Sequence, residues 1–382
     1  MTFGTDRSVD TGRHCEKFWA GRRRPTRRAR VGVVQPRKLR SSPLPPPGRG
    51  LTASGWLVAV GTRTPCGRTL DSSRPAGVEG VPDLVRQRAT AAGDVGRRWL
   101  HELPGIVDEL VERWALSVGE PFSGGTAACV LAVTRSDGSD AVLKVLLPPE
   151  VVGVSELAAA RAAHEHADGQ GCAALLDVDE TRSALLLERL GPNLHELELA
   201  LPEVLTTITD TLLEFWRPLP ADHPFPTGVD KARWLADFIV EEWHRSGEAC
   251  ERAIVDRAVG YCMRRADRFD PGDVVLVHGD AHGWNTLRAG AGFKFVDPEG
   301  VASSRAHDLA VPMREYHEPL LAGDTPSLLR ARADELAKRC GVDPDEVWEW
   351  GYIERVSTGL LNLRDFDDGS GEGFLEVARR CL

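Results

Sequence analysis

The amino-acid sequence predicts an α+β fold of two lobes, a small antiparallel β lobe followed by a larger, mostly helical one. Two observations lead to this prediction. Residues 128–190 carry two pairs of β-rich runs with a helical run between them, which gives the order strand, strand, helix, strand, strand. Residues 191–382 show mainly helical periodicity, interrupted by one short strand and one hairpin. We therefore expect a hinge between the lobes near residues 188–191.

Two helices are expected before the first strand pair. Apolar residues recur at helical spacing in residues 85–92 and 95–114, which predicts amphipathic helices that cover the sheet. Pro104 lies inside the second run, and proline lacks the backbone N–H that a helix interior needs. We therefore expect the helix to break, or a new helix to begin, at Pro104.

The other elements are expected where the period of the apolar residues changes. The small lobe is expected to contain strands at 128–134, 141–147, 173–177 and 184–190, with a helix at 150–167. The large lobe is expected to contain helices at 204–215, 231–244 and 248–269, a strand at 274–278, a hairpin at 285–288 and 293–297, and further helices from Asp308. The turn between the first two strands carries Asp137-Gly138, a pair typical of hairpins.

Residues 1–80 differ in composition from the rest of the chain. They include an arginine-rich run at 21–30 and a proline-rich stretch at 41–48. Such a segment cannot bury enough apolar surface to offset the entropy of an ordered chain. We therefore expect residues 1–80 to be a disordered extension, followed by a small lobe at residues 81–190 and a large lobe at residues 191–382.

The net charge also differs between residues 1–80, which are basic, and the rest of the chain, which is acidic. Residues 1–80 hold 16 Lys and Arg against 5 Asp and Glu, whereas the remaining residues hold 31 against 52. A nucleic-acid or membrane-surface arm is the alternative interpretation of the basic segment. The acidic remainder argues against a nucleic-acid partner, because phosphate backbones bind positive surfaces, and it suits a cationic ligand. No apolar run approaches the roughly 18 residues that a membrane span needs, so we expect a cytoplasmic protein without a membrane segment.

The strongest functional signal is a carboxylate, an amide and a second carboxylate at fixed spacing. Asp280 follows an apolar strand, Asn285 comes five positions later, and Asp297 lies beyond the predicted hairpin. Phosphoryl transfer needs alignment and charge neutralisation more than covalent help. One carboxylate can orient the acceptor hydroxyl, whose oxygen attacks the phosphorus, while an amide oxygen and a second carboxylate can hold Mg²⁺. The sequence therefore predicts a kinase.

These residues resemble a known family. The motif HGDAHGWN at 278–285, together with VDPEG at 296–300, is similar to the aminoglycoside-phosphotransferase group of the protein-kinase-like superfamily. The strand at 141–145 and the segments 114–125 and 185–190 look closest to its streptomycin 6-kinase and hydroxyurea kinase branch. The resemblance covers about residues 81–382. It implies a two-lobed kinase fold with a fifth strand in the small lobe, beyond the four placed above.

The resemblance also implies roles for the residues of the motif. Asp280 would be the catalytic base or would orient the acceptor hydroxyl, and Asn285 and Asp297 would be the Mg²⁺ ligands. The expected cofactors are accordingly ATP and Mg²⁺. His278 is expected to support the loop through hydrogen bonds, and His282 has an alternative role towards substrate or phosphate.

The small lobe is expected to bind the nucleotide. Lys144 lies within an apolar strand, as the phosphate-pairing lysine of kinases does, and its expected partner is Glu156, with Glu165 as the alternative. Gly124 and Gly125 would let backbone N–H groups approach the phosphates. By the resemblance, the backbone of Glu188 and Leu190 would meet the edge of the adenine.

Three further expectations concern the large lobe. Trp284 is expected to pack against the loop. Asp308 is interpreted as a helix N-cap that closes the site from below. The acidic residues Glu241 and Glu242, and the segment 364–369, are expected either to bind ammonium groups of the acceptor or to be solvated surface.

The sequence thus predicts an ATP-dependent kinase that phosphorylates a hydroxyl of a small, cationic acceptor, with a streptomycin-like aminoglycoside as the first choice. Two alternatives remain open at this point. One is a metabolic kinase for a sugar or an amino alcohol. The other is an inactive nucleotide-binding regulator, which the presence of Lys144, Asp280, Asn285 and Asp297 argues against.

Overall fold

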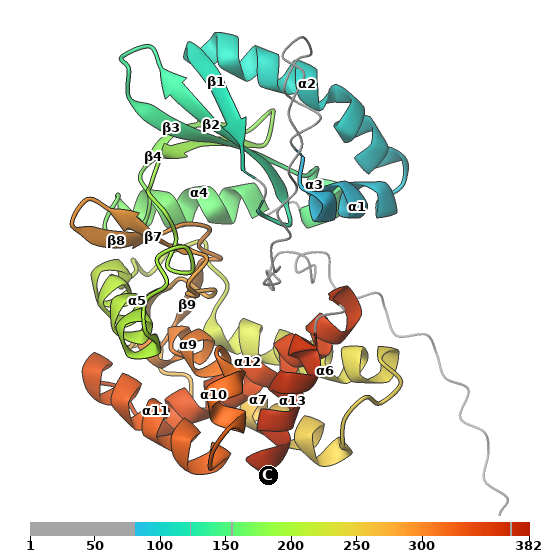
Figure 1. Cartoon of the computed structure of the whole chain (residues 1–382), viewed down its shortest axis with the longest axis vertical. Helices are drawn as coiled ribbons and strands as arrows, with labels where there is room; N and C mark the ends of the chain where they lie inside the picture. Colours follow the sequence, from blue (N-terminus) through green and yellow to red (C-terminus); the bar gives the residue numbers. More distant parts are fainter. Residues whose placement is uncertain (1–80, 123, 154–155, 367–368) are drawn as a thin grey trace, which may run out of the picture. The chain divides into compact units, whose positions relative to one another are not determined.

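The computed structural model describes residues 81–122, 124–153, 156–366 and 369–382. The expectation of a disordered extension over residues 1–80 lies outside the described residues, and the division at residue 190 stays a prediction. Figure 1 shows the described elements in sequence colours, with the sheet of the small lobe in teal to green and the helices of the large lobe in yellow-green to red. The prediction of an α+β fold with a small antiparallel sheet and a mostly helical remainder is confirmed.

The small lobe is built on a five-stranded antiparallel sheet with the strand order β1-β2-β3-β5-β4. The strands are β1 (Leu116–Pro121), β2 (Ala128–Arg135), β3 (Asp140–Leu146), β4 (Leu175–Asp179) and β5 (Ala184–Glu188). Four of them match the strands expected from the sequence. The fifth, which only the resemblance implied, is β1 at the edge of the sheet.

One face of this sheet is covered by α1 (Asp83–Ala91) and α2 (Asp94–Trp114) (Figure 1). Leu103 and Leu110 of α2 pack with Leu131 and Leu143 of the sheet in one buried cluster. The expected break at Pro104 is wrong, since α2 runs through it as a single helix. Burial of the apolar face around the proline stabilises the helix enough to offset the missing hydrogen bond.

The other face of the sheet packs against α4 (Glu156–Ala167). Val142 and Leu146 of β3 share a cluster with α4, and Lys144 lies between them on the same face because side chains alternate along a strand. The prediction of one helix over 150–167 is wrong. A short helix, α3 (Pro149–Val152), ends at Gly153, whose φ of +105° is outside the helical range.

The large lobe is a set of helices around α12. The helices are α5 (Leu201–Phe215), α6 (Gly228–Arg245), α7 (Arg252–Asp267), α8 (Arg305–Asp308), α9 (Ala310–Arg314), α10 (His317–Leu321), α11 (Thr325–Cys340), α12 (Pro344–Asp365) and α13 (Ser370–Arg380). α12 is buried along most of its length, and its buried residues include the charged Glu354 and Arg355. It forms the base on which the functional loops rest.

Two small β pairs carry the loops that contain the motif. β6 (Val275–Val277) pairs with β9 (Val301–Ser303), and β7 (Thr286–Ala289) pairs with β8 (Gly292–Phe295). Segment 278–285 therefore leaves β6 and enters β7, while segment 296–300 leaves β8 and enters β9. Both segments start and end on paired strands, which places them next to each other.

No helix in the described part of the chain is long and apolar enough to cross a membrane.

Candidate active site

Asp308 holds the start of the segment that follows β6. Its Oδ2 accepts hydrogen bonds from the backbone N–H of His278 (2.8 Å) and the indole N–H of Trp216 (2.7 Å). Its Oδ1 accepts one from the backbone N–H of Gly279 (2.7 Å). The interpretation of Asp308 as a helix N-cap is wrong, because Asp308 is the last residue of α8 and Ser304 occupies the N-cap position. Its carboxylate fixes the backbone that leads into the motif.

The His278 side chain supports the same loop from inside. Its Nδ1 accepts a hydrogen bond from the backbone N–H of Asp280 (3.2 Å), so Nε2 carries the proton and donates to the carbonyl of Val296 (3.0 Å). Burial lowers the pKa of His278 to about 4, which keeps the ring neutral. His278 thus ties segment 278–285 to segment 296–300 and agrees with the expected supporting role.

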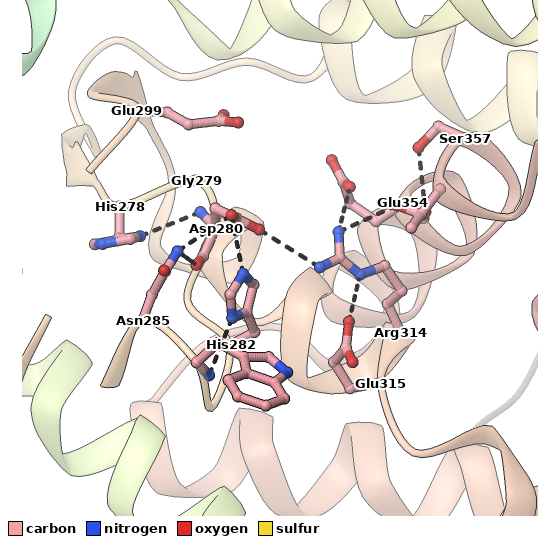
Figure 2. Close-up of polar contacts among 12 residues, drawn as sticks. His278, Gly279, Asp280, His282, Asn285, Glu299, Arg314, Glu315, Glu354 and Ser357 are labelled. Carbon is pink, nitrogen blue, oxygen red and sulfur yellow. Dashed lines mark hydrogen bonds and ion pairs between the residues drawn. The ribbon is translucent and has the colours of Figure 1, made fainter. Parts of the chain in front are cut away.

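Asp280 lies at the centre of a polar network (Figure 2). Its Oδ2 is 3.2 Å from Asn285 Nδ2 and 3.1 Å from His282 Nε2, and its Oδ1 is 3.5 Å from Arg314 Nη2. Burial alone would raise the pKa of Asp280, but its contacts with His282 and with the Arg314 guanidinium lower it to about 2. The carboxylate is therefore ionised at neutral pH.

His282 is fixed in orientation as well. Its Nδ1 accepts a hydrogen bond from the backbone N–H of Trp284 (3.2 Å), so Nε2 carries a proton and faces Asp280. The Trp284 ring stacks on His195 with ring centres 4.3 Å apart, in agreement with the expected packing role.

Asn285 and Asp297, the expected metal ligands, are brought together by the hairpin. The backbone N–H of Val296, the neighbour of Asp297, donates to the carbonyl of Asn285 (2.9 Å). The Asn285 amide nitrogen is used by Asp280, which leaves its oxygen for a cation. Asp297 has a φ of +60°, an uncommon backbone conformation outside glycine. One amide oxygen and one carboxylate are a donor set that suits Mg²⁺ bound together with phosphate oxygens.

Lys144 reaches this same pair of loops. Its Nζ lies 2.7 Å from Asp297 Oδ1, and although burial raises the pKa of Asp297, Lys144 holds it below its usual value. Glu156, at the first turn of α4, has its pKa raised to about 7 by burial, against the opposing charge of Lys144. The alternative partner Glu165 instead pairs with Arg161 at 2.7 Å. The described residues therefore place Glu156, and not Glu165, in the electrostatic environment of Lys144.

The glycine-rich segment lies between β1 and β2. Gly125 has a φ of +107°, where a Cβ would be strained, whereas Gly124 is outside that region and has open space around it. Thr126, which follows, is buried. The two expected glycines therefore differ, because only Gly125 has a conformation that favours glycine.

In residues 188–190, which are expected to meet the adenine, the Glu188 side chain is bound to other parts of the protein. Glu188 Oε2 accepts from the backbone N–H of Ala174 (3.0 Å) and from Lys294 Nζ (2.7 Å). The side chain is thus used structurally, in line with the expectation that the backbone of Glu188 and Leu190 is the part available to a nucleotide. A pocket of about 400 Å³ borders this segment, lined by residues 188–191, residues 288–290 and Lys294.

Known proteins provide an independent comparison. The model of the aminoglycoside/hydroxyurea antibiotic resistance kinase family matches residues 113–366. The chain belongs to this kinase family. A hydroxyurea phosphotransferase of Kitasatospora aureofaciens is 34% identical over 338 residues, which cover 87% of this chain and 91% of the relative. A streptomycin 6-kinase of Streptomyces glaucescens is 29% identical over 290 residues, 75% of this chain and 91% of that relative.

Among solved structures, a choline kinase from Cryptosporidium parvum Iowa II is similar at 12% identity and a TM-score of 0.48, covering 72% of this chain and 90% of that one. The family assignment rests on the sequence relatives alone. As a member of this family, the chain is a phosphotransferase that acts on hydroxyl groups of small molecules, as the sequence predicted.

The kinase has a buried cation beside Asp280 that the sequence did not indicate. Arg314, at the end of α9, is 1% exposed and contacts Glu315 (2.9 Å), Glu354 (3.4 Å) and Thr358 (3.1 Å) in addition to Asp280 (Figure 2). A buried guanidinium needs several acceptors, and these come from α12 and from Glu315, the residue that follows α9. Arg314 therefore connects the Asp280 carboxylate to α12.

A second buried ion pair lies on the other side of the motif. Lys231 of α6 is fully buried, and its Nζ is 2.9 Å from Glu299 Oε2. The Glu299 backbone N–H donates to the carbonyl of His278 (2.8 Å). A Cβ at Gly279 would lie 2.7 Å from Glu299 Oε2, and the φ of Gly279 is +85°, so the motif requires glycine there.

One sequence signal could have identified these residues. Lys231, Arg314 and Glu354 each lie within a run that packs against the core, and a charged residue inside such a run must find a partner in the interior. The sequence does not show which partner, because the pairs join segments that are far apart along the chain.

The acidic residues considered for the acceptor are already paired in this kinase. Glu242 is buried and contacts Arg245 and Arg364, the latter at 3.0 Å. Asp365 lies 2.6 Å from Arg364, and Glu241 2.5 Å from Arg245. Part of the expected segment 364–369 is outside the described residues. The described part is largely neutralised by its own arginines, which argues against its binding ammonium groups of the acceptor.

Proposed function

We propose that this kinase uses ATP and Mg²⁺ to phosphorylate a hydroxyl of a cationic aminoglycoside of the streptomycin type. The observation that carries this proposal is the convergence of Lys144 from the small lobe on Asp297 from the large lobe at 2.7 Å, beside Asn285 and Asp280. This set supplies a cation for the phosphates, two oxygen ligands for a metal ion, and a carboxylate for the acceptor.

In the proposed reaction, the acceptor hydroxyl donates its hydrogen bond to Asp280 Oδ1. Oδ2 already faces Asn285 and His282, whereas the contact of Oδ1 with Arg314 is longer, at 3.5 Å. The hydroxyl oxygen forms a bond to the γ-phosphorus, the bond to the β–γ bridging oxygen breaks, and ADP leaves. The hydroxyl proton passes to Asp280 Oδ1. With a pKa of about 2, Asp280 is a weak base, so it mainly orients the hydroxyl until the O–P bond is nearly formed.

Mg²⁺ would be held by the Asn285 side-chain oxygen and the Asp297 carboxylate. When bound, it neutralises charge on the phosphate oxygens. Lys144 would then contribute its charge to the phosphates, and Glu156 would orient Lys144. The backbone of Glu188 and Leu190 would bind the adenine. Because ATP is a cytoplasmic nucleotide, we place this activity in the cytoplasm.

The choice of acceptor is supported by the relatives and by charge. The family and one relative are named for aminoglycosides or streptomycin, and residues 81–382 are strongly acidic, which suits a cationic ligand and opposes nucleic-acid binding.

A second candidate acceptor is hydroxyurea. The specific observation in its favour is that the hydroxyurea phosphotransferase shares 34% identity with this chain, against 29% for the streptomycin kinase. An inactive nucleotide-binding role is disfavoured, since Lys144, Asp280, Asn285 and Asp297 are all present and adjacent.

The test is a transfer assay with purified protein, ATP and Mg²⁺ against a panel that contains streptomycin, other aminoglycosides, hydroxyurea, sugars and amino alcohols. Mass spectrometry would detect a phosphorylated acceptor, and EDTA should abolish its formation. Product with streptomycin supports the first proposal, and product with hydroxyurea alone supports the second. The absence of any phosphorylated acceptor across the panel would contradict both.

A further inference from the structure

Arg88 lies on α1, outside the segment that matches the family model. The position of α1 is well fixed by packing. Val85 and Ala89 are fully buried in the cluster beneath the sheet. Ala89 also lies so close to Gly96 of α2 that a Cβ at Gly96 would be 1.8 Å from the Ala89 carbonyl oxygen. Arg88 therefore extends from a firmly held helix.

The Arg88 side chain contacts the glycine-rich segment. Its Nη1 donates a hydrogen bond to the carbonyl of Thr126 at 3.2 Å, and Thr126 directly follows Gly124 and Gly125. Arg88 is half-buried, and among the described residues it forms no ion pair with a carboxylate. A guanidinium has five N–H donors in a planar fork, so one neutral carbonyl leaves most of its binding capacity for another acceptor.

Arg88 shares a charged neighbour, Glu156, with Lys144 and Asp297. Burial lowers the pKa of Arg88, while the Asp365 carboxylate at the end of α12 and, more weakly, Glu156 oppose this effect. Glu156 in turn interacts with Lys144 and Asp297 as well as with Arg88. Arg88 thus belongs to the same group of charges as Lys144, and its burial is not compensated by a direct anionic partner.

We propose that Arg88 is a phosphate-binding residue of the kinase, which holds the Thr126 carbonyl and directs its remaining N–H groups to the β- and γ-phosphates of the nucleotide. The inference rests on the proposed function, because it assumes that the triphosphate lies under the glycine-rich segment. It adds a cation from α1, which the motif does not contain. A polyphosphate would supply the missing anion, and arginine binds phosphate oxygens in pairs.

The test measures Kd for ATP, ADP and AMP by calorimetry for the full-length wild type, Arg88→Met, Arg88→Lys and a control. The control is Arg98→Met, which removes the same charge from an exposed position on α2. We expect Arg88→Met to raise the Kd for ATP about tenfold and to leave the Kd for AMP unchanged. The Kd for ATP of Arg88→Lys should fall between the values for Arg88→Met and the wild type. The Kd for ATP of Arg98→Met should match that of the wild type.

Two results would overturn the inference. One is an ATP affinity of Arg88→Met equal to that of the wild type. The other is an equal loss of affinity for ATP, ADP and AMP. This would show that Arg88 stabilises the fold or the adenine site and does not bind the phosphates. A wild type that binds no nucleotide would instead overturn the proposed function, and the inference with it.

Discussion

The two loops that we assign to the active site are built in opposite ways. The catalytic segment 278–285 is almost entirely buried, and its backbone is held by Asp308 and His278 through hydrogen bonds of 2.7 to 3.2 Å. The described residues of the glycine-rich segment, 119–122 and 124–126, are exposed at most positions, and Arg88 contacts the segment at Thr126. Under the proposed function, the part that would orient the acceptor is fixed in advance, whereas the part that would cover the nucleotide is left free to adapt.

This difference has an energetic basis. Each buried polar atom of the catalytic segment would cost about 1 to 3 kcal/mol without a partner, so the network around Asp280 has few alternative arrangements. The glycine-rich segment makes few contacts that would be lost when it moves. Changes in the first loop should therefore affect the rate of transfer most, and changes in the second should affect nucleotide affinity.

The largest effect is expected at the position that joins the two lobes. Asp297→Ala removes a proposed metal ligand and leaves Lys144 without its carboxylate partner, so we expect kcat to fall about 10³-fold. Steady-state kinetics over a range of Mg²⁺ concentrations measures this. Asp256→Ala, which breaks an exposed ion pair on α7, is the matched control. A kcat for Asp297→Ala within threefold of the wild type would contradict the assignment.

The next largest effect tests whether the catalytic segment is fixed by Asp308. Asp308→Asn replaces an acceptor oxygen by an N–H₂ group that faces backbone or indole donors. We expect a loss of about 2 kcal/mol in the free energy of unfolding and about a 10²-fold fall in kcat. Urea unfolding and transfer assays measure the two quantities. A stable variant with normal kcat would show that the segment is held by other contacts.

A smaller effect is expected on ATP affinity when the Glu156 carboxyl changes its ionisation with pH. Burial raises the pKa of Glu156 to about 7, so the ionised fraction rises from about a tenth at pH 6 to about nine-tenths at pH 8. Since only the ionised form can pair with Lys144, ATP affinity should increase several-fold over this range. Glu156→Gln should remove the increase.

The raised pKa of Glu156 lowers the free energy of unfolding as the pH rises, whereas it increases ATP affinity over the same range. A carboxyl whose pKa is raised by folding contributes stability below its unfolded pKa of about 4.3, and this contribution is lost as the pH rises through about 7. Glu156→Gln should therefore be more stable than the wild type at pH 8 and similar to it at pH 4. An unchanged pH profile of ATP affinity in Glu156→Gln would contradict the role of Glu156.

The smallest effects are expected in the glycine-rich segment. Gly125→Ala forces a Cβ into a backbone with φ of +107°, whereas Gly124→Ala meets open space and no positive φ. We expect Gly125→Ala to raise the KM for ATP a few-fold with little change in kcat, and Gly124→Ala to have a smaller effect. Kinetics with varied ATP distinguish the two variants. A larger effect at Gly124 would show that the loop binds phosphate in a different conformation.

The sequence predicted those parts of the site whose spacing is local. Asp280, Asn285 and Asp297 lie on one strand–loop–hairpin unit, so their separation along the chain determines their separation in space. Lys144 was predictable because strand alternation places it on one face of the sheet. The fold class followed from the change of apolar period near residue 190.

The remaining parts depend on contacts between distant segments. Arg314 pairs with Glu354 forty residues away, and Arg88 meets Thr126 across thirty-eight; neither pairing has a local signature. Asp308 looked like a helix cap because its burial beneath the catalytic segment is not visible in the sequence. Pro104 was misjudged because packing of α2 outweighs the local preference of proline.

The most direct test of the account is kcat for Asp280→Asn with the acceptor that the wild type phosphorylates. The substitution preserves shape but removes the ionised oxygen that faces the hydroxyl. We predict a fall in kcat of about 10³-fold with the Kd for ATP within about threefold of the wild type. A variant that keeps more than about a tenth of the wild-type kcat would contradict the central role of Asp280.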